Sequence, residues 1–357
     1  MSLYFSIASA LAFCLVAGGL LLLVKQRLEI LAKPRFDDAA VQASHVGNPL
    51  RIGGVAVIAS LTAVVCLQSV MGQTSFAALL LLSVVPVFIA GLAEDLGHRV
   101  SPRGRFVAAL FSAIAAVAVL GVWVPRGDIP LVDSAMSIPA VAIMLTVIFS
   151  AGFCHAVNLI DGMNGLAASV VASSALGCAA IAAIASLPEI MTFAMLLAAA
   201  TIGFVALNWP VARLFLGDAG AYGLGHLLVW TSILLLAQVQ DLAVPAMALV
   251  VFWPLADALH TIFRRIAEKT SILVPDRMHL HHKVRRTLDI VWFGYRRRDR
   301  SNPLTTIILL PFFVAPVVTG VLLWNNAPAA WIALAAFGVA FAAAHPLTTR
   351  LARTRRR

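Results

Sequence analysis

The chain has 357 residues, of which 61% are hydrophobic and 12% are charged, and its mean hydropathy is +0.95. Soluble globular domains contain roughly 25% charged residues, so this composition excludes a soluble domain. It predicts an all-α protein that crosses a membrane many times.

The apolar runs of the chain are long enough to be transmembrane helices. Crossing a hydrocarbon core of about 30 Å takes about 20 apolar residues in a helix. The first run is predicted as such a helix and not as a signal peptide, because it lacks a basic start and a small-residue cleavage site. Eleven runs of suitable length occur, at about residues 2–24, 52–71, 75–92, 106–125, 138–157, 166–187, 190–207, 220–239, 242–262, 304–325 and 329–345.

The distribution of basic residues predicts the orientation of these helices, because cytoplasmic loops are enriched in Lys and Arg. With the N-terminus outside and the C-terminus inside, only Arg126 of the 26 basic residues lies outside. The net charge of +10 then faces anionic lipids and metabolites, and it does not indicate nucleic-acid binding. We expect one integral membrane domain over residues 1–357, with a cytoplasmic loop at 263–303 and a basic cytoplasmic tail at 346–357.

The stretch GLAEDLGHRVSPRGRF, residues 91–106, places Glu94 and Asp95 at the end of the third predicted helix. The negative end of a helix dipole disfavours carboxylates there. A metal ion or a nearby arginine such as Arg105 should therefore offset their charge. A solvated acid pair within a basic loop is the alternative for either residue alone.

Polar residues interrupt the apolar pattern in HAVNLIDGMNGLAAS, residues 155–169. His155, Asn158, Asp161 and Asn164 are spaced three apart, so they lie near one face of a helical turn. Helix capping explains one of these residues but not four in register. Polar groups at this position in a membrane segment indicate a functional site.

Asp218 lies between Gly217 and Gly220 at the start of the eighth predicted helix, in LNWPVARLFLGDAGAYGLG. In the predicted topology the sixth and eighth helices both begin at the cytoplasmic face, and helix N-termini bind phosphate. Asp218 alone would be explained as an N-cap. Together with Asp161 it is a candidate ligand of Mg²⁺, which favours one or two carboxylates together with phosphate oxygens.

Asp257 lies within the ninth predicted helix, one turn before His260, and Arg264 and Arg265 follow. Ionisable groups inside membranes are rare and are usually paired. We expect Asp257 to orient His260 or an arginine, in either a structural or a catalytic role.

The segment HLHH places His279, His281 and His282 in the predicted cytoplasmic loop. Zinc sites on helices prefer histidines at i and i+4 or long-spaced sets of Cys and His. The basic surroundings also disfavour a cation, so the histidines are predicted to bind phosphate or to transfer protons, for which a pKa of about 6.5 is suitable. These surroundings consist of Arg277, Lys283, Arg285 and Arg286.

Candidate metal ligands, helix N-termini and a basic loop at one membrane face predict phosphoryl transfer to a lipid substrate, in which positioning and charge neutralisation perform most of the catalysis. A transporter or flippase for an anionic substrate or a phosphorylated lipid is the main alternative, because broken helices also build transport sites. Such sites lie near the middle of the bilayer, whereas these polar groups lie at helix ends. Their position favours an enzyme.

Six motifs resemble those of the polyprenyl-phosphate N-acetylhexosamine-1-phosphate transferase family, a part of glycosyltransferase family 4. This family includes the bacterial enzymes that start O-antigen, enterobacterial common antigen and teichoic acid synthesis, and the phospho-N-acetylmuramoyl-pentapeptide transferases. The last motif is similar to the branch that uses UDP-N-acetylhexosamine. In family order, the motifs are HVGNPLRIGG at 45–54, GLAEDL with RVSPRGR, VNLIDGMNGLA, NWPVARLFLGDAG, PLADALHTIFRR and PDRMHLHH.

The resemblance implies that a polyprenyl phosphate such as undecaprenyl phosphate attacks the β-phosphorus of a UDP-sugar and releases UMP. The product, a polyprenyl-diphosphate sugar, would start the synthesis of a cell-envelope polysaccharide. The resemblance further implies Mg²⁺ as cofactor, with Mn²⁺ as an alternative, and Asp218 as its principal ligand beside Asp161. It places the enzyme in the bacterial inner membrane with its active site on the cytoplasmic face, and it allows a homodimer.

The motif match also assigns roles to the other site residues. The catalytic residues would be Glu94, Asp95, Asp161, His279, His281 and His282, with the histidines binding the diphosphate. Substrate binding would fall to Asn158, Asn164, Asn208, Phe215, Arg105 and Arg277, with Phe215 stacking on uracil. Asp257 and His260 would orient their neighbours.

Three residues depart from the pattern of the family. Glu94 stands where Asp is usual, Asn164 where a second Asp is common, and His155 where Asn is frequent. These differences indicate a subfamily with a shifted sugar preference. The sequence leaves open GlcNAc, a deoxy-aminosugar or another HexNAc, and it leaves open direct transfer or a phospho-aspartate intermediate.

Overall fold

The computed structural model describes residues 2–24, 50–72, 76–270, 278–293 and 297–354. These residues form helices without a β-strand, apart from one isolated bridge between Leu50 and Leu214, which confirms the predicted all-α class. In chain order the helices are α1 (Leu3–Leu23), α3 (Gly53–Val70), α4 (Phe76–Ser83), α5 (Val85–Asp95), α6 (Pro102–Leu120), α7 (Pro130–Met136), α8 (Pro139–Leu159), α9 (Leu166–Ile184), α10 (Pro188–Asn208), α11 (Gly217–Gln238), α12 (Val244–Val250), α13 (Phe252–Ala267), α14 (Leu280–Leu288), the π-helix η1 (Asp289–Phe293), α15 (Arg298–Leu322) and α16 (Ala327–Thr354).

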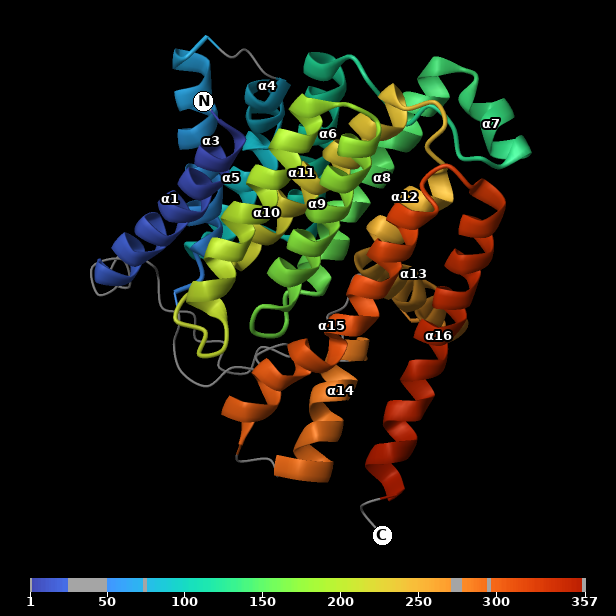
Figure 1. Ribbon diagram of the computed structural model, residues 1–357. Coiled ribbons are helices and arrows are strands. Elements are labelled where there is room, and N and C mark those ends of the chain that lie inside the picture. Colours follow the sequence, from blue (N-terminus) through green and yellow to red (C-terminus); the bar gives the residue numbers. More distant parts are fainter. Residues whose placement is uncertain (1, 25–49, 73–75, 271–277, 294–296, 355–357) are drawn as a thin grey trace.

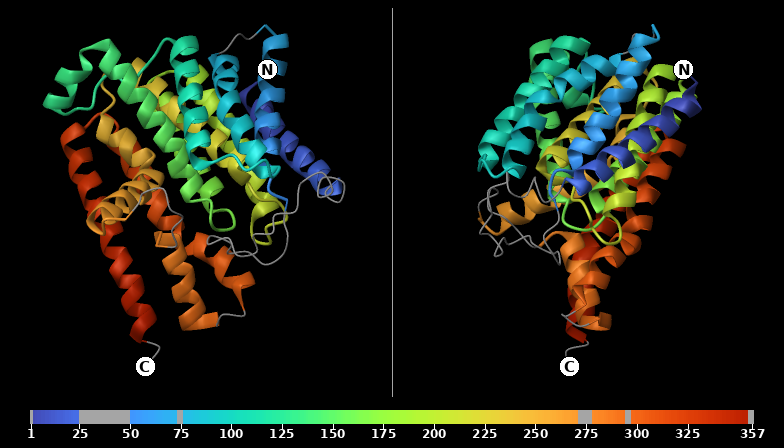
Figure 2. Two further views of the ribbon diagram at one scale, coloured as in Figure 1. Left: turned by 180° about the vertical axis from the view of Figure 1, so that it is seen from behind. Right: turned by 90° about the vertical axis from the view of Figure 1, so that its left-hand side faces the viewer.

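The described helices account for the predicted transmembrane segments. Nine of them, α1, α3, α6, α8, α9, α10, α11, α15 and α16, are long and apolar enough to cross a membrane. Two bent pairs, α4 with α5 and α12 with α13, raise the number of candidate spans to eleven. The start of α1 and the end of α16 lie at opposite ends of the molecule (Figure 1, Figure 2), as an odd number of crossings requires.

Two segments predicted as single helices are broken. The third bends by 43° between α4 and α5, and the ninth, predicted as one helix over 242–262, bends by 92° between α12 and α13. Proline explains both breaks, because it cannot donate to the carbonyl four residues earlier. Pro86 follows the first break and Pro254 the second. The apolar composition continues across both breaks, so composition alone did not predict them.

Several segments predicted as loops contain helices. α7 lies between two predicted spans, and the predicted loop 263–303 contains the end of α13, all of α14 and η1, and the start of α15. The predicted basic tail is part of α16, which continues through Pro346 as far as Thr354. In the part of this region that the structure describes, helices therefore carry the polar residues outward from the bundle (Figure 1).

Local sequence sets the starts of three helices. Pro102, Pro139 and Pro188 are the first residues of α6, α8 and α10, where a missing N–H costs nothing. Ser101 caps α6, and its Oγ accepts a hydrogen bond from the backbone N–H of Gly104 at 3.1 Å. This cap fixes the first turn of the helix that carries Arg105.

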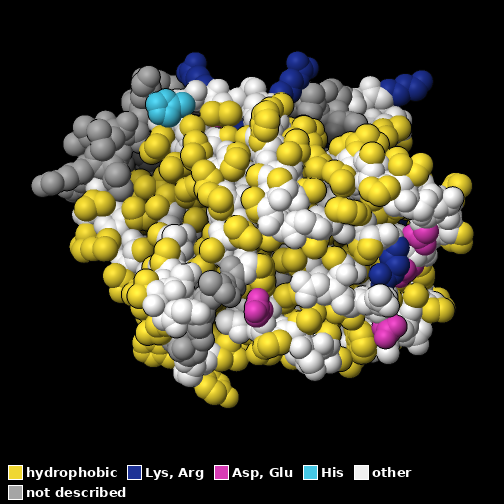
Figure 3. Space-filling model, turned by 90° about the horizontal axis from the view of Figure 1, so that it is seen from above, with side chains coloured by type: hydrophobic (Ala, Val, Ile, Leu, Met, Phe, Trp, Pro, Cys, Tyr) yellow, Lys and Arg dark blue, Asp and Glu magenta, His cyan; other side chains and the backbone are white. Residues whose placement is uncertain are grey.

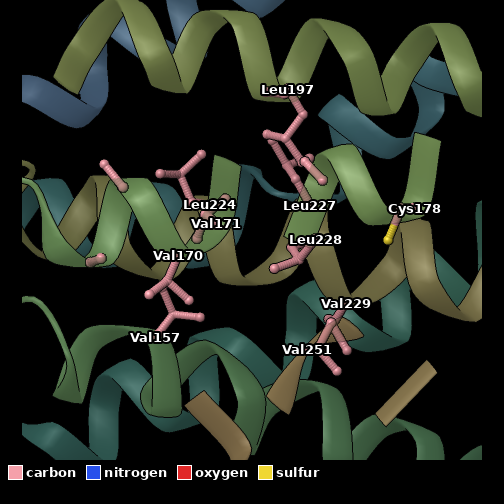
Figure 4. Packing of buried hydrophobic residues seen from close by; sticks show 14 of the residues in the cluster. Val157, Val170, Val171, Cys178, Leu197, Leu224, Leu227, Leu228, Val229 and Val251 are labelled. Carbon is pink, nitrogen blue, oxygen red and sulfur yellow. The ribbon is translucent and has the colours of Figure 1, made fainter. Parts of the chain in front are cut away.

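Helix α11 is the central helix of the bundle. Its hydrophobic stretch is completely buried, and the helix contacts α3, α5, α8 and α9. A helix that is apolar on all sides is expected to be buried in this way. Figure 4 shows the packing around it, in which Leu224, Leu227, Leu228 and Val229 lie among Val157, Val170, Val171, Leu197 and Val251.

Glycines let the N-terminal half of α11 approach its neighbours closely. A Cβ on Gly54 of α3 would overlap the backbone of Gly220, and a Cβ on Gly91 of α5 would lie 2.6 Å from the backbone nitrogen of Ala219. Small residues at helix interfaces allow this close packing in membranes. The start of α11 is thereby held against α3 and α5.

The outer surface of the bundle is largely apolar. Phe111 on α6 and Val339 on α16 are among the large apolar side chains that are exposed, as expected for contact with lipid. The end of the molecule that carries the start of α1 also shows mostly hydrophobic side chains and few charged groups (Figure 3).

Candidate active site

Asp95, the last residue of α5, caps the N-terminus of α11. Its carboxylate accepts hydrogen bonds from the backbone N–H groups of Asp218, at 3.0 Å, and Ala219, at 2.9 Å. The positive end of the α11 dipole therefore offsets the charge of Asp95. The sequence indicated a metal ion or an arginine for this role and did not reveal the contribution of α11.

Asp218 is buried and binds side chains from two other helices. Its Oδ2 forms an ion pair with Nη1 of Arg105 in the first turns of α6. Its Oδ1 accepts a hydrogen bond from Nδ2 of Asn158, near the end of α8, at 3.3 Å. One carboxylate thus joins the ends of α6, α8 and α11.

Two aromatic side chains complete this group. Tyr222 lies one turn after Asp218, and the guanidinium carbon of Arg105 is 5.8 Å from the centroid of its ring. The hydroxyl of Tyr222 is 3.3 Å from Nδ1 of His155. Sequence reasoning missed Tyr222, although its position four residues after Asp218 places both on one side of α11.

Asp161 lies in the turn between α8 and α9, where its backbone N–H donates to the carbonyl of Asn158 at 3.2 Å. Burial raises the pKa of Asp161 to about 7, and the positive charge of Arg51 opposes this rise. A cation beside Asp161 would favour the ionised carboxylate. Because the side chain of Asn158 also binds Asp218, this residue links the two candidate metal ligands.

The described residues contain no group of three His, Cys, Asp or Glu side chains that could hold a metal ion. Mg²⁺ does not require such a group, because it usually takes one or two carboxylates together with water and phosphate oxygens. Asp161 and Asp218 stay the two ligands that the sequence predicts. The burial of Asp161 disfavours its charge, and Asp218 is already paired with a cationic group.

Two asparagines hold the turn that follows Asp161. Asn164 donates its backbone N–H to Oδ1 of Asn302 at 2.7 Å and its side-chain N–H to the carbonyl of Pro210 at 2.7 Å. Oδ1 of Asn208 accepts a hydrogen bond from the backbone N–H of Gly165. These bonds tie the turn to α15 and to the segment between α10 and α11.

The HLHH segment, at the start of α14, lies against the same turn. A Cβ on Gly162 would lie 2.8 Å from Nε2 of His281 and 3.2 Å from Cε1 of His282. His281 is fully buried, and neither of its ring nitrogens has a hydrogen-bond partner among the described residues. Burial and the neighbouring imidazoles, first that of His282 and then that of His279, hold the pKa of His281 well below its usual range.

Asp257 pairs with His279 and not with His260, which corrects one alternative that the sequence suggested. Nδ1 of His279 is 2.6 Å from Oδ2 of Asp257. His260 instead stacks on His345 of α16, with ring centroids 3.7 Å apart. After the sharp bend from α12, α13 presents Asp257 to the start of α14 and His260 to α16.

The other predicted residues lie as follows. The ring of Phe215 is partly buried, and its backbone bonds to Leu50 and Gly53 immediately before α11. Glu94 is partly buried beside Asp95. Arg277 lies outside the described residues.

Several bacterial proteins are similar to this chain. A probable undecaprenyl-phosphate N-acetylglucosaminyl 1-phosphate transferase of Bacillus subtilis is 29% identical over 238 residues, which cover 66% of this chain and 65% of that protein. A decaprenyl-phosphate N-acetylglucosaminephosphotransferase of Mycobacterium leprae is 26% identical over 300 residues, which cover 75% of this chain and 73% of that protein. A phospho-N-acetylmuramoyl-pentapeptide-transferase of Moorella thermoacetica is 29% identical over 228 residues, which cover 59% of this chain and 69% of that protein.

The family model described as glycosyl transferase family 4 matches residues 77–236, from α4 to α11. This segment contributes the carboxylates Asp95, Asp161 and Asp218. This part of the chain is similar to glycosyl transferase family 4. The resemblance of its motifs to this family is therefore confirmed. The HLHH segment lies beyond the matched residues, and the fold returns it to the matched turn at Gly162.

Proposed function

We propose that this protein is a transferase that moves HexNAc-1-phosphate, either GlcNAc-1-phosphate or a related aminosugar phosphate, from a UDP-sugar to polyprenyl phosphate and releases UMP. One observation carries the proposal. Asp95 and Asp218 are hydrogen-bonded to each other, Asn158 connects Asp218 to the turn of Asp161, and His281 lies against that turn. The names of the relatives from B. subtilis and M. leprae, which specify undecaprenyl and decaprenyl phosphate, support the lipid acceptor.

In the proposed reaction, an oxygen of the lipid phosphate bonds to the β-phosphorus of the UDP-sugar. The bond from that phosphorus to the oxygen bridging the two phosphates breaks, and UMP leaves with this oxygen. Mg²⁺ held by Asp161 and Asp218 would reduce the repulsion between the two anionic substrates. Asn158 holds the carboxylate of Asp218 and the backbone N–H of Asp161, and Arg105 adds a positive charge beside Asp218.

We further propose that the enzyme lies in the bacterial inner membrane, with this site at the cytoplasmic face. The positive-inside distribution of Lys and Arg supports this orientation, since Arg126 lies in the connection at the other end of α6. The similarity to proteins of B. subtilis and M. leprae supports a bacterial membrane as the location. At this position the enzyme would start the synthesis of a cell-envelope polysaccharide on its lipid carrier.

The direct test is Mg²⁺-dependent UMP release by the purified protein in detergent with UDP-GlcNAc and undecaprenyl phosphate. Asp218→Ala should lower the rate by roughly 100-fold or more, because it removes a charge at the reacting phosphates. Asp241→Asn, which changes an exposed carboxylate in the connection after α11, should keep the wild-type rate. A wild-type protein that releases no UMP from any UDP-HexNAc would contradict the proposal and favour a transporter.

Gly162→Ala tests the contact between the Asp161 turn and HLHH. The added methyl group would lie 2.8 Å from Nε2 of His281, so the turn or the histidines must move. A displacement of about 1 Å near a reacting centre can cost about 100-fold in rate, and UMP release should fall accordingly. Gly152→Ala on α8, where a Cβ meets nothing within 4 Å, should not change the rate. Equal rates for the two variants would show that the contact is unimportant.

A further inference from the structure

Helix α13 buries a polar face and exposes an apolar one. Asp257, Thr261 and Arg265 are spaced four apart, so they share one side of the helix, and all three are buried. The exposed apolar side chains are Leu259, Phe263 and Ile266. A buried carboxylate requires a partner, because an unpaired charge in such surroundings is costly.

The partner of Asp257 is the first histidine of HLHH. The distance of 2.6 Å between Oδ2 of Asp257 and Nδ1 of His279 is short, as in charge-assisted hydrogen bonds, and both side chains are only 2% exposed. The hydroxyl of Thr261 is 3.4 Å from the same nitrogen. The ring of His279 lies nearly parallel to that of His281, with centroids 5.6 Å apart.

This pairing determines the chemistry of the His279 ring. An ionised carboxylate only accepts hydrogen bonds, so Nδ1 must carry the proton. Any contact between this ring and a substrate must then be made through Nε2. The negative charge of Asp257 also favours the imidazolium form, in which Nε2 is a donor. A cationic donor suits an anionic diphosphate.

We propose that Asp257 is a positioning residue that fixes His279 as a cationic donor, through Nε2, to the diphosphate of the UDP-sugar. This inference rests on the proposed function and adds to it a residue that acts through His279 and does not touch the substrate. The bend between α12 and α13 is part of the arrangement, because it brings Asp257 to the start of α14.

A double-mutant cycle on the full-length protein tests this role through kcat and KM for UDP-GlcNAc. Asp257→Asn should lower kcat by roughly 10- to 100-fold, as loss of a partner that orients a functional histidine typically does. A rise in KM would show that His279 also binds the diphosphate before the reaction, and an unchanged KM would show that it acts on the charge that develops in the transition state. His279→Ala should have a similar or larger effect, and the double variant should be no slower than His279→Ala.

Asp289→Asn is the matched control, because Asp289 is also a buried carboxylate near HLHH but pairs with Arg285, at 3.2 Å. It should lower the unfolding temperature without a comparable loss of kcat. Asp257→Glu keeps a carboxylate acceptor, so its kcat should exceed that of Asp257→Asn. If Asp257→Asn does not fold, the same cycle is run with Asp257→Ser, which also removes the carboxylate.

Two results would overturn the inference. One is a kcat for Asp257→Asn close to that of the wild type. The other is a double variant whose loss is the product of the two single losses, because Asp257 would then act independently of His279. Failure of the proposed function gives a different result, since the wild-type protein itself would release no UMP.

Discussion

Gly217→Ala is expected to lower UMP release by roughly 100-fold or more and to reduce the thermal unfolding temperature, because it displaces the start of α11. Gly217 has φ +74°, a left-handed conformation that costs other residues about 1–2 kcal/mol. A Cβ at this position would also overlap the carbonyl oxygen of Arg51 and lie 2.6 Å from Oδ2 of Asp95. The substitution therefore disturbs the residue next to Asp218 and the carboxylate that caps its helix.

Two other glycines separate the cost of the left-handed backbone from the cost of the steric overlap. Gly121, after α6, has φ +66° and no atom within 4 Å of an added Cβ, so Gly121→Ala carries the backbone cost alone. Gly338 in α16 has neither constraint, and its replacement by alanine should be neutral or slightly stabilising. Unfolding temperatures in detergent should fall most for Gly217→Ala and least for Gly338→Ala. A Gly217 variant as stable and as active as the Gly121 variant would show that the close fit at α11 is not required.

The number and approximate position of the membrane segments could be predicted, because segment length follows from the thickness of the bilayer. The predicted segment 138–157, for example, corresponds to α8, which runs from Pro139 to Leu159. The breaks within the third and ninth segments could not be predicted from composition, because the apolar residues continue across each break. Their local signals are Pro86 and Pro254, since proline removes one backbone hydrogen bond.

The candidate site was partly predictable, because alternating helices return to the same membrane face. Asp161 and Asp218 were placed together on this basis, and Asn158 joins them in the structure. The partner of Asp95 could not be predicted, because the N–H of Asp218 is 123 residues away in the sequence. These contacts depend on how closely the helices pack, which their separate sequences do not specify.

The partner of Asp257 shows the same limit for a sharply bent helix. Spacing along one helix suggested His260, which lies one turn away. The bend at the start of α13 directs Asp257 to His279 instead, 22 residues further along the chain. A sequence pattern identifies which residues share a helix face, but the direction of that face depends on the bend.

Asp95→Asn is expected to reduce both stability and UMP release. The carboxylate of Asp95 accepts two backbone N–H bonds at the positive end of α11, and hydrogen bonds to charged groups contribute about 1.5–3 kcal/mol each. Asparagine keeps one acceptor oxygen but presents an NH₂ group to the second N–H, so one bond is lost and two donors face each other. The start of α11 should move, and Asp218 should move with it.

Asp128→Asn is the control that separates capping from catalysis. Oδ2 of Asp128 accepts the backbone N–H of Val244, the first residue of α12, at 2.7 Å, and Oδ1 pairs with Arg126 at 3.0 Å. Asp128 thus also caps a helix, but it lies in the connection at the other end of α6 from Arg105. Its replacement should lower the unfolding temperature to a similar extent and leave UMP release nearly unchanged, because Asp218 keeps its position. Similar losses of activity in both variants, measured at a temperature where both are folded, would mean that Asp95 acts only through overall stability.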